Sequence, residues 1–198
     1  MGKDTKQKLL ESALDIFSRE GYEKTNIKDI AEASGIVKSG LYRHFDSKEA
    51  IWDAMVEMVA KHYGGNFSSK STHIPESLEE LYRMSMGMYD FTTNDPVVIK
   101  TRILLTKEQF RNEKIKELAN IYFFYQIENR FRNIFKEMMA KHLLKECDEE
   151  ILAFSFAMPV SALIHHGDRI PELKEELREK CSNFVRHFIE EYGIKGDE

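Results

Sequence analysis

The chain has 198 residues, of which 42% are hydrophobic and 32% are charged, and it contains only four prolines. This length corresponds to one or two domains that bury a core without disulfides or metals. The two cysteines, Cys147 and Cys181, show no CxxC spacing, which excludes a disulfide-rich secreted scaffold and a cysteine zinc finger. No apolar run approaches the roughly 18 residues that cross a bilayer, and the N-terminus lacks a signal-peptide pattern. We therefore expect a cytoplasmic protein that does not contact membranes.

The net charge of −5 argues against a protein that binds nucleic acid through a basic coat. Residues 1–50 carry nine basic and nine acidic side chains, whereas the rest of the chain carries the whole negative excess. Any contact with nucleic acid must therefore depend on a few placed cations in the first quarter of the chain.

Apolar residues recur at spacings of three and four along the first quarter of the chain, which predicts amphipathic helices. The first helix, about 5–20, has one apolar face and is ended by Gly21. Thr25 or Asn26 is the expected N-cap of a short second helix, and a third short helix covers about 38–44. Ser47 is the expected N-cap of a fourth helix, about 48–63, which Gly64 and Gly65 end.

Longer helical patterns follow a flexible-looking connection at 66–74. Pro75, Asp148 and Pro171 mark helix starts, and Pro159 lies inside a helix that it should kink. The predicted helices cover about 76–92, 97–110, 112–144, 149–166 and 172–192. The chain is therefore predicted to be all-α with about nine helices. We expect a three-helix domain at 1–48 and a helical domain at 49–198, connected by the fourth helix.

The most informative passage runs from Thr25 to Lys48, TNIKDIAEASGIVKSGLYRHFDSK. Two short helices flank a tight turn at Gly35, which is the layout of a helix-turn-helix whose second helix enters the major groove of DNA. Lysine, hydroxyl and arginine side chains contact phosphates and base edges, and a lysine at a helix start favours a phosphate. The expected DNA-contacting residues are Thr25, Asn26, Lys28, Lys38, Ser39, Gly40, Tyr42, Arg43, His44 and Lys48.

Three blocks of residues 6–60 resemble the DNA-binding domain of the TetR family of bacterial transcriptional repressors. The pattern A-x-x-x-F-x-x-x-G-Y stands at 13–22 and L-Y-x-H-F-x-S/N-K-E at 41–49. The pattern T-x-x-x-I-A-x-x-A/S-G-V/I stands at 26–36, with Asn26 in the place of the threonine. The chain departs from the family pattern at Gly40, where threonine or serine is usual, and at Ile27. Both departures concern the operator sequence and not the mode of binding.

The resemblance implies a homodimer that binds a palindromic operator and whose last two helices pair between subunits. Apolar residues in the last two predicted helices supply this contact, and two recognition helices compensate for the low net charge. The expected interface residues are Leu152, Phe156, Leu163, Leu177, Phe184 and Phe188.

The resemblance also implies a small-molecule effector bound in the C-terminal domain. This domain holds more methionine and aromatic side chains than one buried face needs, although most of them serve as core. Hydroxyl and imidazole groups among them suit a neutral or cationic apolar ligand oriented by one or two hydrogen bonds. The candidate lining residues are Met84, Met88, Phe91, Phe110, Tyr122, Tyr125, Met158 and His165.

The sequence carries no GxSxG, HExxH, Walker or GxGxxG motif, so we expect neither an enzyme nor a bound cofactor. His165 and His166 point roughly 100° apart on a helix, which disfavours a shared metal ion. Two alternatives stay open: a constitutive DNA-binding protein with a structural C-terminal domain, and an enzyme with an unrecognised active site. The sequence does not say whether an effector releases DNA or promotes its binding.

Overall fold

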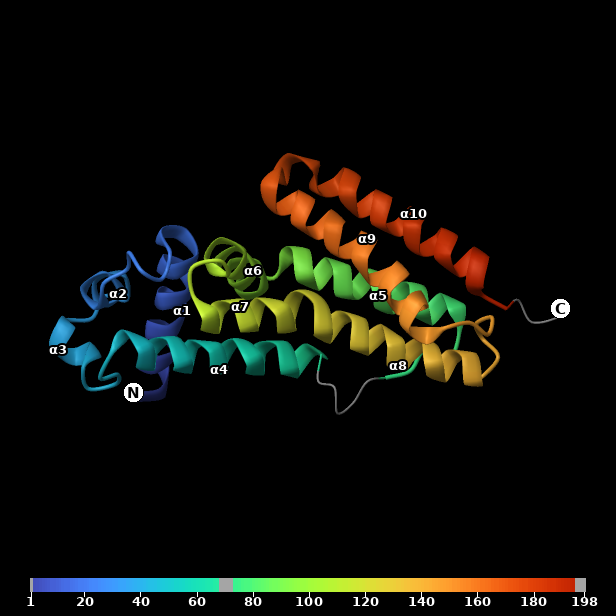
Figure 1. Cartoon of the computed structure of the whole chain (residues 1–198). Helices are drawn as coiled ribbons and strands as arrows, with labels where there is room; N and C mark the ends of the chain where they lie inside the picture. Colours follow the sequence, from blue (N-terminus) through green and yellow to red (C-terminus); the bar gives the residue numbers. More distant parts are fainter. Residues whose placement is uncertain (1, 68–72, 195–198) are drawn as a thin grey trace. The chain divides into compact units, whose positions relative to one another are not determined.

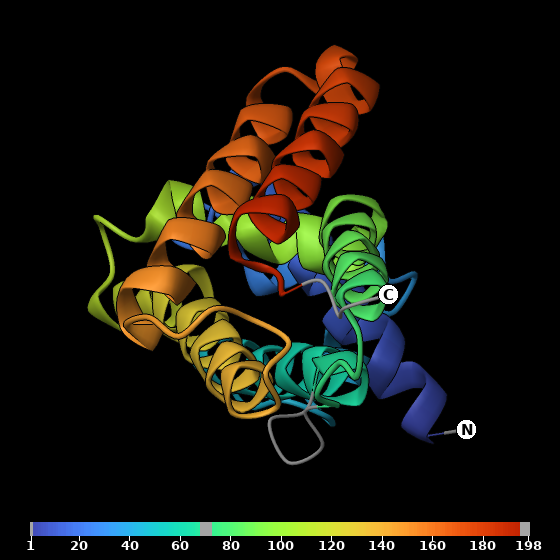
Figure 2. The ribbon, with the colours of Figure 1, turned by 90° about the vertical axis from the view of Figure 1, so that its right-hand side faces the viewer.

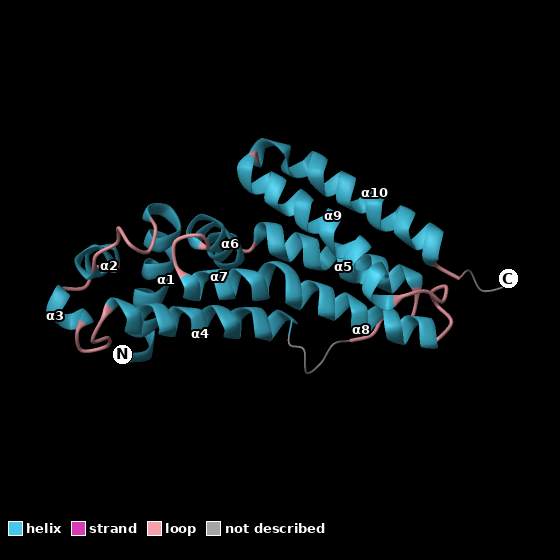
Figure 3. Cartoon of the chain, viewed as in Figure 1, coloured by secondary structure: helices cyan, strands magenta, loops and turns pink. Residues whose placement is uncertain are grey.

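The computed structural model describes residues 2–67 and 73–194, which are almost entirely helical (Figure 3). Within these ranges the only extended pairing is an isolated antiparallel bridge between Leu144 and Gly193. The all-α prediction is therefore confirmed. No helix in the described ranges is long and apolar enough to cross a membrane.

Contacts between Cα atoms divide the chain into two compact units. The first unit comprises residues 1–68 and 96–119, and the second comprises residues 69–95 and 120–198. Residues 96–119 thus group with the N-terminal helices although they follow later in the chain. The predicted domain boundary at residue 48 follows the end of the helix-turn-helix pattern, and it stays a prediction.

The first unit is built around an N-terminal helix that contacts three others in the same unit (Figure 1). Its helices are α1 (Gly2–Glu20), α2 (Ile27–Ala33), α3 (Lys38–Leu41), α4 (Lys48–Phe67), α6 (Pro96–Glu108) and most of α7 (Glu113–Asn120). Helix α1 packs against α2, α4 and α6. Because the apolar face of α1 points into these contacts, Leu14 and Phe17 are almost fully buried.

The helix ends of the first unit follow the predicted signals with one exception. Gly21 ends α1 with a φ of +91°, and its N–H donates to the carbonyl of Phe17 at 2.9 Å. The N–H of Ala50 donates to the hydroxyl of Ser47 at 3.1 Å, as expected of an N-cap. Helix α4, however, continues through 64–65 to Phe67. The prediction that the two glycines end it is wrong, because a helical glycine costs only about 1 kcal/mol relative to alanine.

The second unit consists of four longer helical segments and two short irregular turns. They are α5 (Leu78–Asn94), the π-helical turn η2 (Ile121–Tyr125), α8 (Gln126–Ala140), α9 (Glu149–Arg169), the 3₁₀ turn η3 (Pro171–Leu173) and α10 (Lys174–Tyr192). Helices α7, η2 and α8 follow one another without a break, so the long helix predicted at 112–144 exists but changes its winding in the middle. When this run counts as one helix, the described residues contain the nine expected helices.

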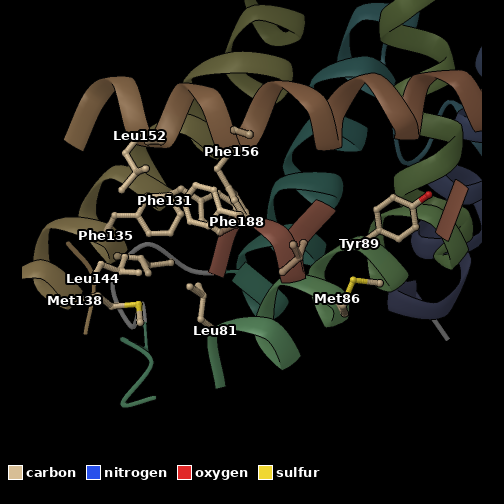
Figure 4. Close-up of a cluster of buried hydrophobic side chains, with 14 of the residues drawn as sticks. Leu81, Met86, Tyr89, Phe131, Phe135, Met138, Leu144, Leu152, Phe156 and Phe188 are labelled. Atoms are coloured by element: carbon tan, nitrogen blue, oxygen red, sulfur yellow. The ribbon is translucent and has the colours of Figure 1, made fainter. Parts of the chain in front are cut away.

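An aromatic cluster forms the core of the second unit (Figure 4). The ring of Phe156 on α9 lies 4.6 Å, centroid to centroid, from the rings of both Phe131 and Phe188. Phe135 stacks on Phe188 at 5.2 Å. These rings join α8, α9 and α10, and the last two helices run side by side (Figure 2).

Four of the six residues that were predicted to form a dimer interface are buried within the second unit. Leu152, Phe156, Leu177 and Phe188 are each at most 4% exposed, so they have no surface to offer a second chain. On α9 the large apolar residues that are exposed are instead Ile151 and Phe154, at 69% and 56%. Sequence periodicity identified the apolar helices but selected the face that packs inside the chain.

Candidate nucleic-acid interface

Helices α2 and α3 form a helix-turn-helix whose inner face is closely packed. Ile30, Ala31, Leu41 and Phe45 are at most 5% exposed. The turn between the helices contains Gly35 with a φ of +69°, a left-handed conformation that favours glycine. The packing fixes which side chains of α3 face outward.

The residues before α2 hold the start of this motif in place. Thr25 is only 2% exposed, and its hydroxyl donates to the carbonyl of Gly21 at 2.8 Å. The N–H of Asn26, the N-cap of α2, donates to the carboxylate of Asp29 at 2.9 Å. Thr25, predicted as a DNA contact, is thus a buried structural residue, whereas Asn26 is exposed.

The outer face of α3 and the turn after it is polar and positively charged. Lys38, Ser39, Tyr42 and Arg43 are exposed, and the ammonium of Lys38 lies 5.8 Å from the ring centre of Tyr42. His44 and Gly40 are half-buried beside them. No aspartate or glutamate occurs between positions 33 and 45. Lys38 and Arg43 therefore lie in a stretch of the sequence that contains no acidic residue.

The remaining predicted cation of α2 has an acidic neighbour. Lys28 is exposed, and its ammonium lies 3.5 Å from the carboxylate of Glu32 one helical turn later. Because both side chains are about 70% exposed, solvent and salt screen this ion pair. A phosphate can therefore replace Glu32 as the partner of Lys28 at little cost in free energy.

Lys48 has a different environment from the one predicted. Its ammonium donates to the carbonyls of Tyr22, Thr25 and Glu23 at 3.0, 3.3 and 3.4 Å. It also lies 4.4 Å from the ring centre of Tyr22. The lysine thus ties the start of α4 to the loop after α1, and its charge is turned toward the protein. The predicted phosphate contact does not agree with this geometry, because the donors already have acceptors.

An aromatic cluster beneath this lysine fixes α1 against α4. The rings of Phe17, Tyr22 and Trp52 lie within 5.1–5.9 Å of one another. The hydroxyl of Tyr22 donates to the carboxylate of Glu49 at 3.4 Å. Burial, with the negative charge of Glu49 in second place, raises the pKa of Tyr22 to about 12. The cluster makes a rigid base for the helix-turn-helix.

Val37, the residue that precedes α3, is not among the predicted DNA contacts. Its side chain is 71% exposed, although it is apolar and lies between the buried residues Ala31 and Leu41 in the chain. A valine next to a turn is ordinarily assigned to the core, so the sequence held no signal for its exposure. Only the packing of α2 against α3 shows that this side chain faces out.

The predicted ligand-lining residues divide into two groups. Phe110 and Tyr125 are 88% and 63% exposed, so neither lines an enclosed pocket within its own unit. The other six are partly buried and belong to the second unit: Met84, Met88, Phe91, Tyr122, Met158 and His165.

Polar groups stand among these partly buried residues. The ring of His165 meets the ring of Phe123 edge-on at 5.0 Å, and its Nδ1 lies 3.8 Å from the carboxylate of Asp168. Burial raises the pKa of Tyr122 and lowers the pKa of Arg130. The described residues contain no group of three side chains suited to a metal ion. The second unit therefore combines apolar side chains with a few hydrogen-bonding groups.

Three comparisons agree on the relatives of this chain. Residues 9–55 match the family model described as bacterial regulatory proteins, tetR family. The chain is 28% identical over 133 residues to IcaR, the HTH-type negative transcriptional regulator of the biofilm operon icaADBC in Staphylococcus aureus (strain Newman). The matched region covers 67% of this chain and 67% of IcaR.

Solved structures share the fold over nearly the whole chain. The SmeT–triclosan complex has a TM-score of 0.77 at 18% identity and covers 98% of this chain and 93% of its own. SmeT is the repressor of the Stenotrophomonas maltophilia multidrug efflux pump SmeDEF. A TetR-family regulator from Mesorhizobium loti has a TM-score of 0.73 at 18% identity, covering 97% and 98%. The helix-turn-helix, the family model matched by residues 9–55 and the shared fold together make this chain similar to TetR-family transcriptional regulators.

Proposed function

We propose that this protein is a dimeric repressor that binds a palindromic operator and whose affinity for DNA is controlled by a small apolar ligand. The observation that carries the DNA-binding part is the outer face of α3. There, exposed Lys38 and Arg43 stand beside the hydroxyls of Ser39 and Tyr42 with no acidic residue from position 33 to 45. Such a face suits phosphates and the acceptor-rich edges of bases in the major groove.

The dimer is supported by the outer face of α9. Ile151 and Phe154, three residues apart, lie on one side of the helix and are more than half exposed. Ser155, Pro159 and Ala162 continue this side with small exposed residues. Exposed apolar side chains followed by small ones allow two helices to approach closely. A second copy, paired across a two-fold axis, places two recognition helices on two half-sites.

The effector is supported by the composition of the second unit. Met84, Met88 and Met158 are partly buried around the aromatic core, and methionine adapts to varied apolar ligands. Tyr122 and His165 supply a hydroxyl and an imidazole for orientation. The π-helical turn that carries Tyr122 is of a kind often found at functional sites. SmeT, which shares the fold, forms a complex with triclosan.

The DNA-binding proposal is tested by selecting duplexes from a random-sequence library with the full-length protein. We expect an inverted repeat, and we expect Lys38→Ala and Arg43→Ala each to weaken binding and to lower the salt slope by about 1. Lys180→Ala, which removes an exposed lysine from α10, is the matched control and leaves both unchanged. Recovery of sequences without any common element would overturn the proposal.

Lys48 requires a separate measurement. Because Lys48→Met leaves three carbonyls without their donor, we expect it to lower the free energy of unfolding by about 1–3 kcal/mol. Lys24→Met, at an exposed position in the loop after α1, should change the free energy of unfolding little. Urea unfolding measures the stability of both variants. An unchanged stability of Lys48→Met would contradict a structural role for Lys48.

The effector proposal is tested by a thermal-shift screen against neutral and cationic apolar compounds, repeated with the selected duplex. A compound that raises the melting temperature should also change the affinity for DNA, and Met88→Trp should abolish this response while DNA binding persists. If no compound changes DNA affinity, the protein is a constitutive DNA-binding protein. The sign of the change distinguishes release of DNA from enhanced binding.

A further inference from the structure

We infer that Val37, uncovered by Gly40, contacts the methyl group of a thymine in the operator and so determines part of the sequence preference. This inference rests on the proposed function, because it assigns a reading role to one side chain of the DNA-binding face. It concerns a residue that contributes no charge and no hydrogen bond. Its effect on binding is therefore separable from that of the cations.

The first observation is the exposure of Val37. The apolar residues that join α2 to α3, among them Ile30 and Leu41, are completely buried, whereas Val37 is 71% exposed. Val37 is the N-cap residue of α3, with φ −66° and ψ 147°, and makes no side-chain hydrogen bond there. Its methyl groups therefore do not contribute to the core of the first unit. Val37 directly precedes Lys38 and Ser39 in the chain, and all three side chains are exposed.

The second observation is the absence of a side chain at position 40. A Cβ atom on Gly40 would lie 2.8 Å from Cγ2 of Ile36 and 3.7 Å from Cγ2 of Val37. The first distance is too short for two carbon atoms, so a side chain here would force Ile36 to shift. The second distance shows that any side chain at this position would cover a methyl group of Val37. Glycine thus leaves this methyl open and lets another molecule approach the helix closely.

The surroundings decide what kind of group fits this patch. The apolar surface of Val37 is small and is flanked by Lys38 and, further along, by Arg43, without an acidic residue from 33 to 45. The partner must therefore be anionic overall and must present a small apolar group between its charges. In the major groove the thymine C5-methyl is that group, and small aliphatic side chains recognise it. We therefore assign Val37 to a thymine and not to a protein partner.

The experiment uses a duplex selected from a random-sequence library by the wild-type protein. Each thymine is replaced, one position per half-site at a time, by uracil, which keeps the base pair and removes only the methyl group. At one position we expect wild-type affinity to fall about fourfold per half-site, as for the loss of one buried methyl group. Fluorescence anisotropy with the full-length protein measures each affinity.

The same duplexes are then titrated with Val37→Ala and with Ser39→Ala. We expect Val37→Ala to bind the thymine and uracil duplexes with nearly equal affinity, whereas Ser39→Ala keeps the wild-type ratio. Thermal melting shows whether Val37→Ala is folded, which we expect because the side chain is exposed.

Two outcomes would overturn the inference alone: no thymine is sensitive to uracil, or Val37→Ala keeps the wild-type ratio at the sensitive position. In both cases sequence-specific binding by the cations and hydroxyls would remain. If the library yields no common sequence at all, the proposed function fails as well, so the two failures are distinguishable.

Discussion

At the scale of single residues, the two left-handed glycines of the first unit serve different purposes. Gly21 and Gly35 have φ angles of +91° and +69°, which an L-residue adopts only with strain. A Cβ atom on Gly21 would also lie 2.5 Å from Oε1 of Glu108, whereas a Cβ on Gly35 would meet nothing within 4 Å. Gly21 is thus required by conformation and by packing, and Gly35 by conformation alone.

This difference gives a matched pair of variants. We expect Gly35→Ala to lower the free energy of unfolding by about 1–2 kcal/mol, the strain of a left-handed residue. Gly21→Ala should cost about 1–3 kcal/mol more, because the carboxylate of Glu108 must move. Urea denaturation at constant protein concentration measures both values.

Glu108→Ala provides the control for the packing contribution. Glu108 is 4% exposed and, among the described residues, its buried Oε2 has no hydrogen-bond partner. In this background the extra cost of Gly21→Ala should disappear. Equal costs for Gly21→Ala in both backgrounds would contradict the assignment to Glu108.

At the scale of the elements, a polar seam joins α5 to α10 beside the aromatic core. The guanidinium of Arg178 donates to both carboxylate oxygens of Asp90 at 2.7 and 2.8 Å. One turn further along α10, the hydroxyls of Ser182 and Tyr82 lie 2.8 Å apart, and the guanidinium of Arg186 lies 4.3 Å from the Tyr82 ring centre. The paired helices are therefore held in one register by oriented contacts as well as by apolar packing.

A double-mutant cycle measures the strength of this seam. Asp90 and Arg178 are 35% and 46% exposed, so solvent screens their pair, and we expect a coupling free energy of about 0.5–1 kcal/mol despite the two-point geometry. The variants are Asp90→Ala, Arg178→Ala and both together, unfolded with urea at low and high salt. Coupling that does not weaken with salt would mean that the pair acts through packing.

At the scale of the whole molecule, α9 presents two aromatic residues to two different environments. Phe156 is 1% exposed and lies in the core of the second unit, whereas Phe154, two residues earlier, is 56% exposed. Residues two apart on a helix point to different sides. The first therefore stabilises the fold, and in the proposed dimer the second lies between subunits.

The two phenylalanines should respond oppositely to truncation. We expect Phe156→Ala to lower the free energy of unfolding by about 3–5 kcal/mol through the cavity that it leaves. Phe154→Ala should leave the chain folded but raise the dissociation constant of the dimer. Sedimentation over a range of concentrations, with circular dichroism of the same samples, measures both. A Phe154→Ala protein as dimeric as wild type would exclude this face of α9 from the interface.

The sequence by itself determined the helical architecture and the identity of the DNA-binding motif. Helix periodicity is local, and caps such as Gly21 and Ser47 act within one turn, so both are legible without the fold. The block from Leu41 to Glu49 is equally local, and it carries the resemblance to the TetR family. One local prediction was wrong: the glycines at 64–65 do not end α4, because glycine weakens a helix without ending it.

Only the tertiary structure decided what individual side chains do. Lys48 faces three carbonyls, Thr25 is buried and Val37 is exposed, each because of a neighbour that is distant in sequence or packed across a turn. The same holds for α9, where periodicity found apolar residues but could not say that Phe156 meets Phe188 inside the chain while Phe154 stays outside. The physical reason is that a side chain's role depends on which groups surround it, and contacts between separate helices form only on folding.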